Sequence, residues 1–153
     1  MTTARLIAIA LSTSLLAGPV LSQQWGHAAA PMGQFEGGIS LEGEEASISY
    51  GCAGFYGNVD FYAKGVQVDA GESVIRVDGQ EVARGNTQYN STSDTTTFGL
   101  NVRHEWGPDR WSAYNGVINA LASGSEAVWE TPTGAVFSFP LAGSAKIRSC
   151  LMK

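Results

Sequence analysis

The side chains best suited to chemistry are few, because the 153 residues include only two cysteines and two histidines. In an oxidising compartment, Cys52 and Cys150 most simply form one disulfide, whereas in a reducing one they would stay as two buried free thiols. A metal site would need further ligands, and neither His27 nor His104 stands at ligand spacing from a cysteine. We therefore predict a Cys52–Cys150 disulfide and no metal site.

Nucleophilic catalysis has little support in the sequence. The run "GESVI" lacks the second glycine of a nucleophile elbow, and no Ser-x-x-Lys is present. His104 is the only candidate general base, because His27 lies in an N-terminal segment without periodicity. His104 and Glu105 follow a strand, so their side chains should point to opposite faces and form no dyad. We interpret His104 as a surface histidine at the end of a strand.

Paired carboxylates are the remaining route to hydrolysis, but the sequence gives no geometry that would select a pair. The run "NSTSD" matches a calcium loop only faintly, because such a loop needs alternating oxygen ligands. We predict no catalytic residue, no cofactor and no enzymatic activity, with a hydrolase as the least favoured class. The candidate acids are Asp60, Asp69, Glu72, Asp78, Glu105, Glu126 and Glu130.

Aromatic residues beside chain breaks give a different kind of candidate site. Phe55 and Tyr56 stand between glycines, and Trp106 and Trp111 flank a Gly-Pro break. An exposed aromatic side chain on a rigid scaffold often marks a surface that recognises protein or sugar. The alternative, which we favour for the two tryptophans, is that they close the core where a strand meets a helix. The four residues are our candidate recognition surface.

The N-terminus has the pattern of a secretory signal peptide. Arg5 is followed by an apolar stretch, Leu6–Leu16, that is too short to span a bilayer. Val20 and Ser22 are small enough for the positions that signal peptidase reads. We predict a signal peptide over 1–22, cleaved near Ser22, and a periplasmic or extracellular protein.

Residues 23–153, the 131 residues after the predicted signal peptide, have a charge and a length that limit the class of protein. They hold eight basic and fourteen acidic residues, so they lack the basic stripe that nucleic acid or an anionic membrane would require. No second apolar run of about 18 residues follows, so we predict no membrane insertion. This length suits one domain. We expect an extended entry segment over 23–37 and a single β-rich domain over 38–153.

Short alternating runs predict strands through most of the chain up to about residue 105. In the run 58–65, Val59 and Phe61 share one face, with Asp60 and Tyr62 on the other. Asp78-Gly79 between two alternating runs is typical of a two-residue hairpin. A second hairpin is predicted near the C-terminus, with "EAVWE" and "AVFSF" as its strands.

The apolar period changes to that of a helix after residue 110. Ser112 is the predicted N-cap of this helix and Gly124 its C-terminal end. Ser144 is the predicted cap of a last helical turn that carries Cys150. One face of the first helix is apolar, at Tyr114, Val117, Ile118 and Leu121.

These elements predict an α+β fold that is mostly β. We expect an antiparallel sheet that forms a sandwich or partial barrel, with one mid-chain helix and a short C-terminal helix. One disulfide would tie the C-terminus to the start of the β region.

The order of elements resembles small exported β-rich proteins of proteobacteria, in particular the invasion-associated locus B group and the type VI secretion-associated group called VasI. The resemblance covers Ile39 to Cys150. Its most specific parts are the run "FPLAGS" before the final helix and the Ser-Gly-Ser that ends the first helix. These groups have no established catalytic residues, so the resemblance implies a periplasmic role and assigns no site.

The sequence therefore favours an exported, non-enzymatic binding or accessory protein that acts through a protein-contact surface. Its partner would be another exported or cell-envelope protein. The alternative is a proteinaceous inhibitor of a cell-wall hydrolase such as lysozyme, because the net negative charge would steer the protein to a basic enzyme.

Overall fold

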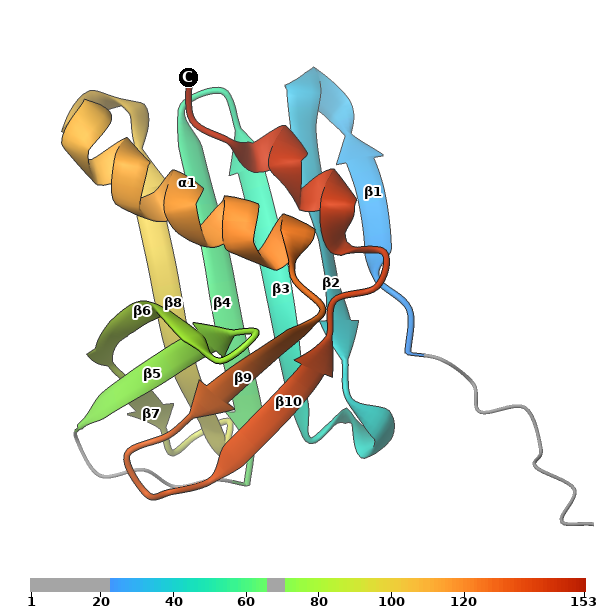
Figure 1. Ribbon diagram of the computed structural model, residues 1–153, viewed down its shortest axis with the longest axis vertical. Helices are drawn as coiled ribbons and strands as arrows, with labels where there is room; N and C mark the ends of the chain where they lie inside the picture. The colour runs from blue at the N-terminus through green and yellow to red at the C-terminus, as the bar shows by residue number, and fades with distance from the viewer. Residues whose placement is uncertain (1–22, 66–70) are drawn as a thin grey trace, which may run out of the picture.

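The computed structural model describes residues 23–65 and 71–153, so the predicted signal peptide lies outside the described residues. It shows the predicted α+β fold, mostly β, with two antiparallel sheets, a mid-chain helix and the Cys52–Cys150 disulfide (Figure 1). The two sheets pack against each other as in a sandwich, and the helices complete the same layer as the smaller sheet.

The larger sheet has six strands among the described residues, in the order β1-β2-β3-β4-β8-β7. Its central strands β3, β4 and β8 alternate over most of their length between buried and more exposed side chains, so one face lies in the core and the other faces outward. The strands are β1 (Gly26–Ala30), β2 (Gln34–Ser40), β3 (Ala46–Ala53), β4 (Tyr56–Lys64), β8 (Thr95–Arg103) and β7 (Gln88–Asn90).

The smaller sheet has the order β10-β9-β5-β6 within the described part of the chain. Both predicted hairpins are confirmed, since β5 pairs with β6 and β9 with β10. Asp78 and Gly79 form the first turn, both with positive φ, and the Asp78 carboxylate accepts hydrogen bonds from the backbone N–H of Ser125 and Glu126. The strands are β5 (Glu72–Val77), β6 (Gln80–Asn86), β9 (Glu126–Glu130) and β10 (Val136–Pro140).

The helix α1 (Pro108–Ser123) and the 3₁₀ helix η4 (Ser144–Cys150) lie over one end of the larger sheet, and the smaller sheet lies over the other end (Figure 1). Both cover the same face, and no second layer formed by residues 23–65 and 71–153 covers the opposite face of the larger sheet. The predicted apolar face of α1 is confirmed as buried. The described residues also form the short 3₁₀ helices η1 (Pro31–Gly33), η2 (Glu42–Glu44) and η3 (His104–Trp106).

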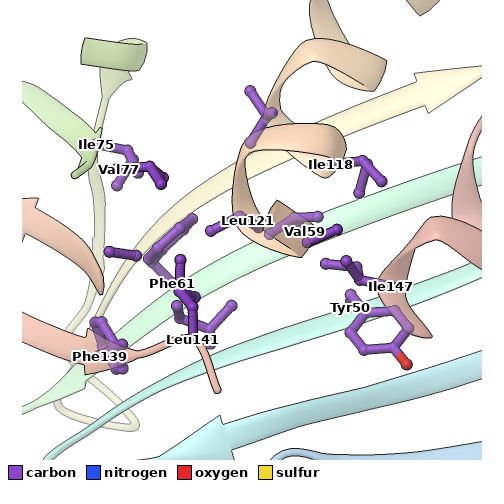
Figure 2. Packing of buried hydrophobic residues seen from close by; sticks show 14 of the residues in the cluster. Tyr50, Val59, Phe61, Ile75, Val77, Ile118, Leu121, Phe139, Leu141 and Ile147 are labelled. Carbon is purple, nitrogen blue, oxygen red and sulfur yellow. The ribbon is translucent and has the colours of Figure 1, made fainter. Parts of the chain in front are cut away.

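The core lies between the larger sheet and this second layer (Figure 2). Phe61 of β4 is fully buried, and its ring lies about 6 Å from those of Phe98, Trp129 and Phe139. The indole N–H of Trp129 donates to the Ser73 hydroxyl at 2.8 Å, so this buried donor is satisfied. Side chains from both sheets therefore meet around Phe61.

The predicted N-caps, Ser112 and Ser144, are wrong in both helices. α1 begins at Pro108, four residues before the predicted Ser112, because proline suits a first helical position where its missing N–H costs nothing. Ser144 does not cap η4; its hydroxyl donates to the carbonyl of Leu121 at 2.7 Å, which ties η4 to α1. Gly124 is the C-cap of α1, as predicted.

The N-terminal segment 23–37 contains β1, η1 and the first half of β2, so it forms part of the larger sheet. The Trp25 indole N–H donates to the carbonyl of Pro140 at 2.9 Å. The two ring nitrogens of His27 lie 2.6 Å from the Tyr50 hydroxyl and 2.8 Å from the Gly143 carbonyl oxygen. A carbonyl only accepts, so His27 donates from Nε2 and, when neutral, accepts from Tyr50 at Nδ1.

Candidate functional site

The aromatic residues singled out in the sequence gather at one end of the larger sheet. The backbone N–H of His104, in η3, donates to the carbonyl of Phe55 at 2.9 Å, which joins η3 to the β3–β4 turn. Phe55 is 67% exposed, and its ring meets that of Tyr56 edge-on at 5.1 Å. Trp106 is 46% exposed. We call Phe55, Tyr56 and Trp106 the aromatic tip.

The two tryptophans have different environments. The interpretation of Trp106 as a core residue is wrong, because η3 and the positive φ of Gly107 turn the chain outward just before α1 begins. Trp111 fits the core interpretation, since it is half-buried against the core. Its indole N–H donates to the Arg103 carbonyl at 3.1 Å, and its ring lies 4.7 Å from that of His104. Trp111 therefore supports η3 and is not itself the exposed surface.

A hollow of about 580 Å³ lies beside the tip, where β4 and β8 come together. Phe55 and Tyr56 line it from the β3–β4 side, and Arg103, His104 and Glu105 line it from the end of β8 and η3. An apolar ring next to groups of both charges is the composition of many protein-contact surfaces.

A second depression, of about 600 Å³, lies on the outward face of the larger sheet. Its floor includes Gly26, Gly37 and Gly51, so strands β1 to β3 add little side-chain bulk there. We call it the outer groove; its larger side chains are His27, Glu36, Ser49, Tyr50, Tyr56, Asn58, Asp60 and Tyr62. Tyr56 and Asn58 line both depressions, so the outer groove continues to the aromatic tip.

Strand alternation places four of these side chains in one row. Residues 56, 58, 60 and 62 of β4 point outward, because Val59 and Phe61 between them are fully buried. The sequence predicted that Asp60 and Tyr62 share a face, but it did not predict the groove. The groove arises from strand pairing, which sets Gly51 opposite Asn58 and Gly99 opposite Asp60.

Asp60 and Asn58 are fixed against the sheet. The Asn58 side-chain N–H donates to the Asp60 carboxylate at 2.5 Å. A Cβ atom at Gly99 would lie only 2.5 Å from Asp60 Oδ1, so glycine leaves the room that this side chain occupies. Burial raises the pKa of the Asp60 carboxyl, and the Asn58 hydrogen bond opposes that shift in part.

Tyr114 of α1 lies on the core side of the same strand. Its ring packs on Gly57, where an added Cβ would lie 2.5 Å from the hydroxyl oxygen. The hydroxyl has no hydrogen-bond partner within residues 23–65 and 71–153. Burial, and to a lesser extent the negative charge of Asp60, raise the pKa of Tyr114.

Tyr114→Phe is expected to raise the free energy of unfolding by about 1 kcal/mol, because it removes a buried polar group that lacks a partner and preserves the ring. Urea unfolding measures the change. Tyr50→Phe is the matched control and should lower stability by about 1 kcal/mol, since the Tyr50 hydroxyl is bonded to His27. A loss of stability in Tyr114→Phe would contradict this description of the hydroxyl.

The candidate general base His104 and its neighbour Glu105 have different partners. His104 contacts Trp111, while Glu105 lies 3.7 Å from Arg103, so no hydrogen bond joins His104 to Glu105 in the structure. Other acids are held by arginines: Glu130 by Arg76 at 3.1 Å, and Glu72 by Arg84 at 3.4 Å. Asp69 lies outside the described residues. Among those described, no group of three histidine, cysteine or acidic side chains could hold a metal ion.

Comparison of the chain with family models, with curated proteins and with solved structures found no match. Within the described residues, no helix is both long and apolar enough to cross a membrane.

Proposed function

We propose that this protein is an exported, non-enzymatic binding protein that contacts another protein through its aromatic tip. The observation that carries the proposal is the exposure of Phe55 and Trp106, at 67% and 46%, on adjoining segments at one end of the sheet. Buried aromatic side chains supply much of the binding energy of protein interfaces, so large exposed rings are an apt contact surface.

The tip is held in place before a partner arrives. The hydrogen bond from His104 N–H to the Phe55 carbonyl fixes the β3–β4 turn against η3, and Trp111 anchors η3 through the Arg103 carbonyl. A fixed surface loses less conformational entropy on binding than a mobile loop does. This arrangement supports a role in recognition.

Export is the second part of the proposal. The Cys52–Cys150 disulfide is compatible with an oxidising compartment, and the N-terminal pattern of Arg5 and an apolar stretch favours a signal peptide cleaved near Ser22. We therefore propose a periplasmic or extracellular location. The partner would be another exported or cell-envelope protein.

Inhibition of a cell-wall hydrolase such as lysozyme is the second candidate. The observation that favours it is the acidic outer groove next to the tip, together with a formal net charge of −5, which would attract a basic enzyme. Lysozyme activity, titrated with the purified protein across several lysozyme types, tests it. A lack of inhibition at large molar excess excludes this candidate.

Affinity capture from the cell envelope of the source organism tests the contact surface. Phe55→Ala and Trp106→Ala should each weaken retention of the captured partner at least about tenfold, because each removes an aromatic anchor. Val136→Ala is the control, since Val136 is 59% exposed but lies in β10 of the smaller sheet. Equal retention by all three variants would contradict the proposed surface.

A further inference from the structure

The charge of the outer groove is one-sided. Its described lining includes two carboxylates, Glu36 and Asp60, and neither lysine nor arginine; the histidine in the lining, His27, has its ring nitrogens bonded to Tyr50 and Gly143. Tyr56 and Tyr62, six residues apart on β4, border the row that contains Asp60. In an extended strand this separation corresponds to roughly 20 Å. The groove therefore combines negative charge with aromatic side chains at both ends of the row.

Asp60 differs from the paired acids of the structure. It is half-buried, yet in the described part of the chain it forms no ion pair, and it accepts a hydrogen bond from the neutral amide of Asn58. In contrast, Glu72, Glu81 and Glu130 each lie within 4 Å of an arginine nitrogen. Partial loss of hydration destabilises a carboxylate, as the raised pKa of Asp60 also indicates.

A cation in the groove would stabilise the partly dehydrated carboxylate of Asp60. A guanidinium group can donate several hydrogen bonds in one plane to a carboxylate, and it also stacks on aromatic rings. The ring of Tyr62, two residues from Asp60 on the same face of β4, can add a cation–π attraction. Since the whole chain carries a formal net charge of −5, a basic partner would also be steered toward it.

We propose that the outer groove binds an arginine side chain of a basic protein partner, with Asp60 as the principal acceptor. This inference rests on the proposed role in protein binding, because the groove adjoins the aromatic tip through Tyr56 and Asn58. Glu36, exposed at the edge of the groove, adds to the negative potential. Asn58 holds the Asp60 carboxylate in position.

A titration with a defined peptide tests the proposal. The probe is an acetylated, amidated Gly-Arg-Arg-Gly peptide, added to the ¹⁵N-labelled protein without its signal peptide. We expect saturable shifts of the backbone amide signals of Ser49, Gly51 and Gly99, which lie in or beside the groove. The same peptide with citrulline in place of arginine should give no saturable shifts, because citrulline keeps the shape but lacks the charge.

Two variants locate the effect. Asp60→Asn should weaken peptide binding at least about tenfold while leaving the spectrum of the fold intact, because asparagine keeps the shape of the side chain but removes its charge. Glu126→Gln is the matched control, since Glu126 is exposed on the smaller sheet. The affinity of this variant for the peptide should stay within about twofold of the wild-type value. Added salt should also weaken binding.

Several results would overturn the proposal: no shift at the groove, equal binding of the citrulline peptide, or no effect of Asp60→Asn. Saturation of the groove by a neutral chitin oligosaccharide, without binding of the arginine peptide, would assign it to sugars instead. A failure of the groove proposal can be distinguished from a failure of the proposal that the aromatic tip binds a partner. If the tip variants lose the partner while the peptide does not bind, the groove proposal alone is wrong.

Discussion

Replacing both Cys52 and Cys150 with alanine is expected to lower the free energy of unfolding by about 4 kcal/mol. The bond joins β3 to η4 across a sequence separation of 98 residues, so it removes much of the freedom of the unfolded chain. The loss is a large share of the total stability of a domain of this size. Urea unfolding of the oxidised protein and of the double variant measures it.

Reduction of the wild-type protein provides the control. With both thiols reduced, its free energy of unfolding should fall close to that of the double variant, because the two proteins then lack the same constraint. A loss below about 1 kcal/mol would show that the cross-link has little effect on stability. Thiol titration of the unreduced exported protein should find no free cysteine, and two free thiols would contradict the disulfide.

Phe61→Ala is the substitution in the core with the largest expected effect, a loss of about 4 kcal/mol. Phe61 is fully buried, and its ring meets aromatic side chains from β8, β9 and β10. Alanine would leave a cavity where the two sheets meet, and the surrounding rings cannot fill it without leaving their preferred rotamers. Chemical unfolding of the variant measures the loss.

Phe55→Ala is the matched control for that substitution. It makes the same chemical change at a side chain that is 67% exposed, so it should alter the free energy of unfolding by about 0.5 kcal/mol or less. Similar losses in the two variants would contradict the placement of Phe61 at the centre of the core. The same control also shows that a binding defect of Phe55→Ala does not arise from unfolding.

Local patterns in the sequence were sufficient for much of the fold. The alternation in β4 assigned Val59 and Phe61 to one face and Asp60 and Tyr62 to the other, because a strand has a period of two residues. Asp78-Gly79 predicted its hairpin, since the turn requires positive φ. These elements depend on residues close together in the chain.

Features that depend on distant partners were not predictable in the same way. β1 and the start of β2 are rich in glycine and alanine and have no apolar alternation; β2 is a strand because β3 pairs with it, and β1 is a strand because β2 pairs with it. The outer groove depends on the register that sets Gly51 and Gly99 beside Asn58 and Asp60. The exposure of Trp106 follows from where η3 meets the sheet, which local propensity does not determine.

Cross-linking inside the source organism tests the central claim most directly. A photoreactive phenylalanine analogue would replace Phe55 or Trp106 in the aromatic tip, and Val136 in β10 as the control. The account predicts that both tip positions form a covalent adduct with the same cell-envelope protein on irradiation, and that position 136 does not. Absence of adducts from both tip positions, or the same adduct in equal yield from all three, would contradict recognition through the tip.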